Sequence, residues 1–310
     1  MNTPILSPDT PAAPEERRLL RSLSRRTGAA LLLVCALQLA AGFAAVRLQG
    51  LFGAESGLWL HVLAALGGMT ILSGALAGKQ MLGGEILLAK TEPCPALEAC
   101  LLVPAGAALC MAGNAAGAIA EQLAGRAGLE FHGAPEIEAP QGLPLLLLQL
   151  LTTALLPALA EEWLLRGVLL PPLRRFGGGF AVACTAALFA LLHQNMQQAP
   201  MAFVSGLVLG WAYIRSGRLL VPVAIHFWNN AAVSAFMLLS DRAANVYVMA
   251  LGAFGLLCLL ILYANRPAPQ KAETGLSAGR QAMLYFFGSV PMVLALVYYI
   301  AMIVLNTSAV

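Results

Sequence analysis

The chain has 310 residues, of which 59% are hydrophobic and only 11% are charged, and its mean hydropathy is +0.78. An ordinary soluble domain carries about 25% charged residues, so this chain lacks the polar groups to cover a globular surface. The composition excludes a soluble enzyme, a disordered chain and a nucleic-acid-binding module, for which the net charge of +3 is also too small. It predicts an all-α, polytopic transmembrane helix bundle, because apolar runs of about 20 residues recur along the whole chain.

Residues 1–27 are rich in proline and arginine and are predicted to form a disordered cytoplasmic arm that leads into the first anchor helix. They do not resemble a cleavable signal peptide, because the following apolar run is too long and no clear small-residue cleavage site is present. Nine apolar stretches then predict about eight or nine membrane spans. These stretches cover residues 28–46, 57–78, 97–120, 143–170, 179–196, 200–214, 219–240, 245–264 and 281–305.

The stretches divide the chain into three membrane regions after the arm. Residues 28–142 are expected to form N-terminal transmembrane helices and a loop, and residues 143–240 a helical core. Residues 241–310 are expected to form C-terminal transmembrane helices, with a proline-rich cytoplasmic linker over residues 266–280. Gly206 and Gly210 form a G-x-x-x-G pair that predicts a helix-packing notch.

The distribution of basic residues predicts the orientation of the chain. If the N-terminus is cytoplasmic and each span crosses once, fourteen of the 18 basic residues lie inside and three outside, with Arg166 within a span. The three outside residues are Arg47, Arg126 and Arg242. This asymmetry follows the positive-inside rule. The preference for arginine over lysine is typical of a GC-rich bacterial genome, so we expect a multi-pass protein of the bacterial inner membrane. The six scattered cysteines predict no disulfide framework.

Two acids lie deep in an apolar stretch, in LLPALAEEWLLRGVLLPP. A charge at the bilayer centre costs about 2.5–3.5 kcal/mol on insertion scales, so such a cluster usually faces a cavity. Glu162 and Arg166 are four residues apart on one helical face, which predicts an ion pair. Glu161 points about 100° away and is the freer carboxylate, suited to act as a general base. A neutralised packing network is the alternative interpretation.

Two histidines occupy later spans. His193 follows Phe189 by four residues, so the phenyl ring can pack against the imidazole and orient it. His226 precedes Asn230 by four residues and shares its face, whereas Asn229 is expected to point elsewhere. Taken singly, these residues could equally be interfacial or interhelical hydrogen-bonding groups, as we expect for Asn114 and Gln149.

Depth favours a single site over independent packing contacts. Counted at 1.5 Å per residue from the predicted inner boundary, Glu161, His193 and Asn230 lie about 18 to 22 Å deep, and His226 about 12 Å. Polar groups on three separate helices are therefore predicted to share one broad layer of the membrane.

Three ordered motifs now resemble a known family. They are Glu161-Glu162-x-x-x-Arg166, Phe189-x-x-x-His193 and His226-x-x-x-Asn230, and they are similar to those of the CPBP or Abi family of intramembrane proteases, which includes CAAX proteases and bacteriocin-processing enzymes. The resemblance covers about residues 143–240.

The resemblance implies an intramembrane endopeptidase with its catalytic core in that region. It implies that Glu161 activates a water held by His193 and Asn230, that His226 stabilises the oxyanion, and that Glu162, Arg166 and Phe189 support this geometry. Zinc is possible on Glu161, His193 and His226, although H-E-x-x-H is absent and we favour a metal-free mechanism. The expected partners are membrane lipids and a membrane-associated protein or peptide substrate, with no nucleic acid.

Two other functions stay open. A proton-coupled transporter could use Glu161, His193 and His226 as a proton relay, but it predicts repeated halves that the sequence does not display. A non-catalytic membrane scaffold could carry the same motifs. The substitution Glu161→Gln distinguishes the classes, because the protease loses cleavage, the transporter loses coupled flux and the scaffold keeps its function.

Overall fold

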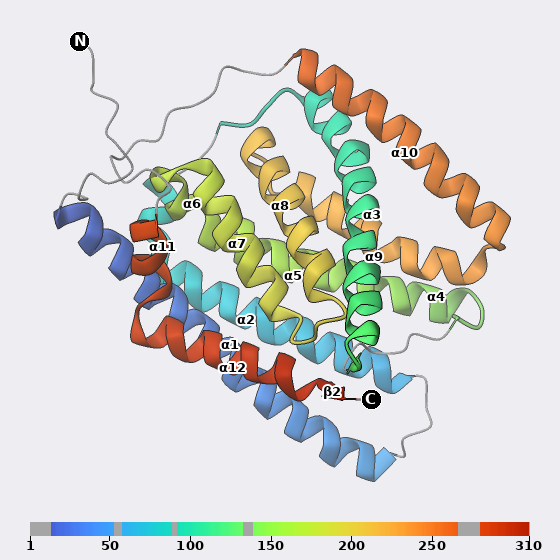
Figure 1. The fold of residues 1–310 in the computed structure, drawn as a ribbon, viewed down its shortest axis with the longest axis horizontal. Coiled ribbons are helices and arrows are strands. Elements are labelled where there is room, and N and C mark those ends of the chain that lie inside the picture. Colours follow the sequence, from blue (N-terminus) through green and yellow to red (C-terminus); the bar gives the residue numbers. More distant parts are fainter. Residues whose placement is uncertain (1–13, 53–57, 89–91, 133–138, 266–279, 310) are drawn as a thin grey trace.

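The computed structural model describes residues 14–52, 58–88, 92–132, 139–265 and 280–309. Over these ranges the chain is an all-α bundle with one short two-stranded sheet, as predicted (Figure 1). The N-terminal part consists of α1 (Pro14–Phe52), α2 (Leu58–Leu88), α3 (Ala96–Arg126) and β1 (Leu129–Phe131). The C-terminal part consists of α10 (Asp241–Ala264), α11 (Arg280–Phe287), α12 (Val290–Leu305) and β2 (Thr307–Ala309).

The central part begins with a continuous helical rod over Leu143–Phe176. The rod contains α4 (Leu143–Gln149), η1 (Leu150–Leu155), α5 (Leu156–Glu162), η2 (Trp163–Leu169), α6 (Leu170–Leu173) and η3 (Arg174–Phe176). It is followed by α7 (Gly178–Leu192), α8 (Ala199–Ser216) and α9 (Leu220–Leu238). Each of the nine predicted apolar stretches therefore falls on helical structure.

Six helical segments are long and apolar enough to cross a membrane, and a seventh results if the bent pair α11–α12 counts as one span. α7 has only 15 residues, which gives about 22 Å against a hydrocarbon core of about 30 Å. α8 is also not one of the six. The chain is therefore a polytopic membrane protein, and eight or nine crossings remain a prediction.

Two expectations about the ends of the chain need correction. The helix α1 begins at Pro14, so half of the predicted arm is helical; residues 1–13 lie outside the described residues. Its first turns are held by packing, because Leu20, Leu23 and Ser24 are buried, and the Ser24 hydroxyl donates to the Phe286 carbonyl and can accept from the Ser289 hydroxyl. The last predicted span is bent by 82° between α11 and α12, where Gly288 and Ser289 interrupt the helix.

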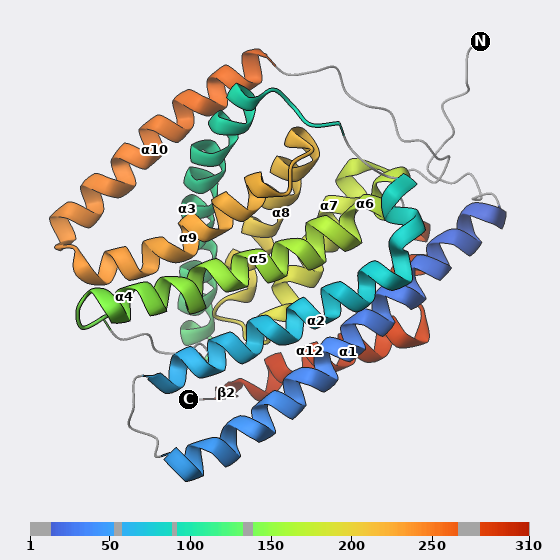
Figure 2. The same cartoon turned by 180° about the vertical axis from the view of Figure 1, so that it is seen from behind.

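The helices form two outer groups and one central group that contains the rod. α1 packs against α2, α11 and α12 on one side, and α3 packs against α9 and α10 on the other. The rod, α7 and α8 lie between these groups (Figure 2). The predicted core of residues 143–240 is thus enclosed by the N-terminal and C-terminal helices. The predicted linker lies outside the described residues, except for Arg280.

The long helices run between two ends of the bundle (Figure 1). At one end, Arg175 is paired with Glu85 at 2.6 Å, Arg215 is paired with Glu98, and Arg218 donates to the Cys94 carbonyl at 2.8 Å. At the opposite end, β1 pairs antiparallel with β2, with Glu130 opposite Ser308. Which end is cytoplasmic stays a prediction.

Candidate active site

The two buried acids lie on the central rod between two π-helical segments. α5 carries Glu161 and Glu162, with η1 before it and η2 after it. At the end of each segment an N–H donates to the carbonyl five residues earlier, and a proline follows at once: Pro157 after η1 and Pro171 after η2. A proline has no N–H to donate and its ring clashes with the carbonyl four residues before it, so a wider turn accommodates it. Such π turns often mark functional sites.

Glu162 and Arg166 form the predicted ion pair. Arg166 Nη1 donates to Glu162 Oε1 at 2.8 Å, and both side chains are fully buried. Arg166 Nη2 also donates to the Gly206 carbonyl of α8 at 2.9 Å. The guanidinium carbon lies 5.0 Å from the centre of the Phe189 ring, so the cation also contacts an aromatic face. Arg166 therefore joins the rod to both α7 and α8.

The same Glu162 oxygen holds a histidine of α9. His226 Nδ1 lies 2.9 Å from Glu162 Oε1, and a carboxylate oxygen can only accept, so Nδ1 carries the proton. The opposite ring nitrogen, Nε2, lies 3.9 Å from Oε2 of Glu161. Glu162 thus fixes the ring orientation, and Nε2 faces the second carboxylate.

Glu161 is the freer of the two carboxylates, as expected from its position on the helix. Its Oε2 atom is buried and has no hydrogen-bond partner among the described residues. An unpaired buried carboxylate oxygen is costly, which makes it a candidate for binding a water or a substrate group. Its side chain is 14% exposed, whereas that of Glu162 is fully buried.

His193 lies at the end of α7, and its ring packs as predicted. The ring centres of Phe189 and His193 are 5.0 Å apart in an edge-to-face arrangement, and the Phe189 ring makes a second such contact with His226 at 5.5 Å. His193 Nδ1 lies 2.9 Å from the Phe189 carbonyl oxygen. A carbonyl only accepts, so Nδ1 donates and Nε2 is left as an acceptor.

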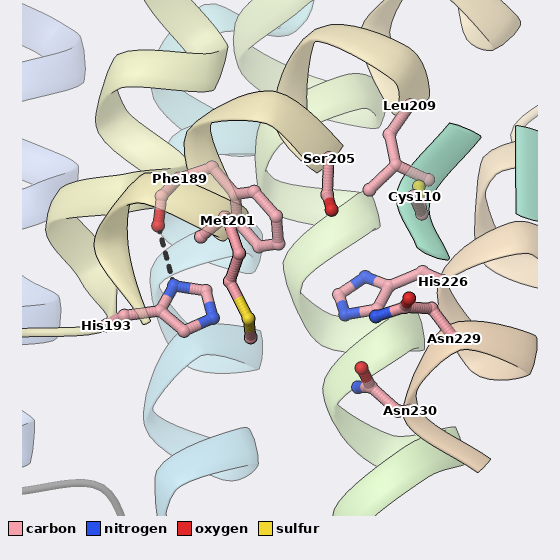
Figure 3. Close-up of a pocket in the computed structure, with 10 residues that line it drawn as sticks. Cys110, Phe189, His193, Met201, Ser205, Leu209, His226, Asn229 and Asn230 are labelled. Carbon is pink, nitrogen blue, oxygen red and sulfur yellow. Dashed lines mark hydrogen bonds between the residues drawn. The ribbon is translucent and has the colours of Figure 1, made fainter. Parts of the chain in front are cut away.

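Several of these groups line a small cavity of about 30 Å³ between α3, α7, α8 and α9. Both histidines line it, from opposite sides (Figure 3). Glu161 is not one of its lining residues; it lies beside His226 at 3.9 Å. The lining residues are Cys110, Phe189, His193, Met201, Ala202, Ser205, Leu209, His226, Asn229 and Asn230. The structure thus brings His193, His226 and Asn230 to one cavity.

Both asparagines of α9 reach this cavity, which corrects the expectation that Asn229 points elsewhere. Asn229 Oδ1 accepts from Asn114 of α3 at 3.5 Å, and Asn230 Nδ2 donates to the Thr153 carbonyl of the rod at 3.5 Å. Thr153 is four residues before Pro157, which has no N–H to offer that carbonyl. The two neighbouring amides therefore face different helices while they border the same cavity (Figure 3).

Besides Asn229, sequence reasoning missed five lining residues: Cys110, Met201, Ala202, Ser205 and Leu209. Small and apolar side chains in an apolar helix carry no signal that distinguishes cavity lining from lipid contact. Gln149, expected to be an interhelical partner, donates to Ser234 at 3.0 Å and does not line the cavity.

The three possible zinc ligands do not form a metal centre in this geometry. Among the described residues, no group of three or more His, Cys, Asp or Glu side chains is arranged to hold a metal ion. His193 and His226 lie on opposite sides of the cavity (Figure 3), and Glu161 is not one of its lining residues. The donor set therefore does not fit a zinc site.

Comparisons with known proteins agree with the three motifs. Residues 143–232 match the family model described as type II CAAX prenyl endopeptidase Rce1-like. This segment is therefore similar to the CPBP/Abi family. The matched residues contain Glu161, Glu162, Arg166, Phe189, His193, His226 and Asn230, so the predicted CPBP/Abi resemblance is confirmed for the part of the chain that carries the cavity.

Two curated bacterial proteins are similar to part of this chain. The membrane-embedded CAAX protease MroQ of Staphylococcus aureus is 34% identical over 92 residues, which are 27% of this chain and 37% of MroQ. An uncharacterized 24.3 kDa protein of Escherichia coli is 36% identical over 94 residues, which are 28% of this chain and 43% of that protein. The chain thus spans less than half the length of these relatives. No solved structure matches.

Proposed function

We propose that this chain is an intramembrane endopeptidase that hydrolyses a peptide bond of a membrane-associated protein or peptide. One observation carries the proposal: the unpaired carboxylate oxygen of Glu161 lies 3.9 Å from His226 Nε2, beside a cavity lined by two histidines and two asparagines. The CPBP/Abi match over the same residues supports it, as does the name of MroQ.

The first step is the activation of water. Two atoms 3.9 Å apart can both contact one water at about 2.8 Å, so a water can bridge Glu161 Oε2 and His226 Nε2. Glu161 removes a proton from this water as its oxygen attacks the carbonyl carbon of the scissile bond. His193 Nε2, an acceptor, and the amide of Asn230 orient the water or the peptide from the cavity wall.

The second step is the stabilisation of the negative charge that develops on the carbonyl oxygen. His226 in its imidazolium form donates Nδ1–H to Glu162 and has Nε2–H free for the oxyanion. The charges stay balanced: Arg166 and the imidazolium offset Glu161 and Glu162 before the attack, and they offset Glu162 and the oxyanion once Glu161 holds the proton. The proton held by Glu161 then passes to the leaving nitrogen as the C–N bond breaks, and the carboxylate is restored.

Glu162, Arg166 and Phe189 are positioning residues in this scheme. Glu162 fixes the His226 ring, Arg166 holds Glu162, and the Phe189 ring contacts both imidazoles and the guanidinium. No step uses a metal, because the donor set does not fit one. The protein is proposed to lie in a bacterial inner membrane with a cytoplasmic N-terminus.

The proposal is tested by incubating purified protein with a library of membrane-anchored peptides, comparing the wild type with Glu161→Gln. Glu130→Gln is the matched control, because Glu130 is exposed on β1 at one end of the bundle. Cleavage by the wild type and by Glu130→Gln, but not by Glu161→Gln, is expected. Equal cleavage by all three proteins would overturn the assignment of Glu161, and a zinc chelator that abolishes cleavage would overturn the metal-free mechanism.

A further inference from the structure

The turn that follows His193 contains a strained residue. Gln194 has a φ of 58°, and it is the only residue other than glycine with a positive φ in the described part of the chain. Gln194 follows the C-cap residue of α7 and adopts the left-handed conformation, which at a helix C-terminus is usually adopted by glycine or asparagine. A strained backbone of this kind persists only where neighbouring structure holds it, and it is frequent at functional sites.

Two contacts from distant helices hold Gln194. Its side-chain Nε2 donates to Gln38 Oε1 of α1 at 3.0 Å, and its carbonyl accepts from Asn306 Nδ2, directly after α12, at 3.0 Å. Both partners lie outside the CPBP/Abi segment of residues 143–232. The turn beside His193 is therefore anchored by parts of the chain that carry no motif.

Asn306 is itself held from the other side. Its carbonyl accepts from the His132 N–H at 2.7 Å, and His132 Nε2 lies 2.8 Å from the Ser308 hydroxyl. The antiparallel pairing of β1 with β2 continues this link. His132, which follows α3 and β1, thus holds Asn306 after α12, and Asn306 holds Gln194 after α7.

The turn is coupled to the orientation of the imidazole. His193 continues the helical conformation at the end of α7, with a φ of −74°. Its Nδ1 bonds back to the Phe189 carbonyl, and its own carbonyl accepts from buried Asn195 at 2.7 Å. If Gln194 relaxes to a negative φ, the direction of the chain changes at the residue directly after His193.

We propose that Gln38 and Asn306 are positioning residues that hold Gln194 in its left-handed conformation and thereby keep His193 Nε2 directed into the cavity. Because Gln38 lies on α1 and Asn306 follows α12, the N-terminal and C-terminal helices would both help to position His193. The kinetic consequence rests on the proposed peptidase function, whereas the conformational consequence does not.

The test uses the full-length protein and three variants. Asn306→Ala removes the donor to the Gln194 carbonyl. The double variant Asn306→Ala/Gln194→Gly has glycine at the strained position. Glycine adopts a positive φ without penalty, so the contacts from Gln38 and Asn306 are no longer needed to hold it. Thr307→Ala is the control, because the Thr307 hydroxyl donates to the Ile303 carbonyl of α12 and not to the turn.

The conformational readout is the ring-nitrogen NMR signal of His193, identified by its loss in His193→Gln. In the wild type and in Thr307→Ala we expect one signal with a protonated Nδ1. In Asn306→Ala we expect a shifted or broadened signal, and in the double variant a wild-type signal. This readout needs no substrate, so it tests whether Asn306 positions His193 even if the chain is not a peptidase.

The kinetic readout is cleavage of a membrane-anchored peptide. Asn306→Ala is expected to lower kcat about tenfold with little change in KM, because a displaced group at the reacting centre reduces the rate more than binding. The double variant is expected to recover most of this loss. An unchanged His193 signal in Asn306→Ala, or a changed signal that Gln194→Gly does not restore, would overturn the proposal.

Discussion

Glu162 Oε1 lies 2.9 Å from His226 Nδ1 and 2.8 Å from Arg166 Nη1, so one carboxylate oxygen accepts hydrogen bonds from a histidine and an arginine. The hydrogen bond between Glu162 and His226 distinguishes the roles of the two acids of the motif. Glu162 Oε1 has two partners while Glu162 Oε2 has none among the described residues, and Glu161 lies beside the opposite nitrogen of the same ring. Adjacent glutamates therefore acquire different chemistry from their neighbours.

The first prediction concerns the buried ion pair. Arg166→Met leaves Glu162 charged and buried, and the loss of one partner from such a pair typically costs about 3–5 kcal/mol. Adding Glu162→Gln removes the uncompensated charge, so the double variant should regain part of the lost stability. Thermal unfolding in detergent measures both effects, and an unchanged melting temperature in Arg166→Met would contradict the structure.

The second prediction concerns His226. His226→Gln removes the proposed donor to the oxyanion, and loss of one such donor costs about 10²–10³ in kcat. The KM should change little, because the interaction forms in the transition state. Steady-state cleavage of a membrane-anchored peptide measures both constants. A rise in KM at constant kcat would instead indicate that His226 only binds the substrate.

The third prediction concerns the packing of α7 against α8. A Cβ at Gly206 would lie 2.9 Å from Ala186 Cα and 3.2 Å from the Phe189 ring, and at Gly210 the neighbour is Val182 at 3.0 Å. These contacts confirm the predicted packing notch. Gly206→Ala is expected to destabilise the protein by about 1–3 kcal/mol, typical of overpacking, and to disturb the Gly206 carbonyl that binds Arg166.

The matched control for this substitution is Gly252→Ala in α10. No atom lies within 4 Å of a Cβ built at Gly252. Because alanine favours a helix over glycine, this variant should unfold at the wild-type temperature or slightly above. Equal melting temperatures for Gly206→Ala and Gly252→Ala would mean that the α7–α8 contact is looser than the structure has it.

The polar site could be predicted because ionisable residues are rare in apolar helices and expensive there. Glu161, His193 and His226 stand out in their stretches for this reason, and helical spacing then correctly paired Glu162 with Arg166. The nine apolar stretches predicted the helices in the same way, since hydrophobic length is a local property of the sequence.

Features that depend on contacts between distant segments could not be predicted. Spacing on an ideal helix separates Asn229 from Asn230 by about 100°, yet α9 lies between α3 and the rod, so both amides border the cavity. The contact between Gln194 and Asn306 joins residues 112 positions apart. The 82° bend before α12 depends on a two-residue break in one hydrophobic run.

The fourth prediction concerns orientation. Asn306 and β2 lie at the end of the bundle opposite to Arg175, Arg215 and Arg218, which is the end expected to face the cytoplasm. A reporter fused after Val310 should therefore be active only outside the cytoplasm, and a reporter fused at the N-terminus only inside. A C-terminal fusion that is active only inside would contradict the odd number of crossings.

The central claim is that Glu161 activates the water that cleaves the peptide bond. The most direct measurement is the rate at which Glu161→Gln, reconstituted in liposomes, cleaves a peptide that the wild type cleaves, with both proteins shown to unfold at similar temperatures. General-base catalysis contributes about 10²–10⁴-fold, so the rate should fall at least a hundredfold. A rate within a few-fold of the wild type would contradict the account and assign the chemistry to another group.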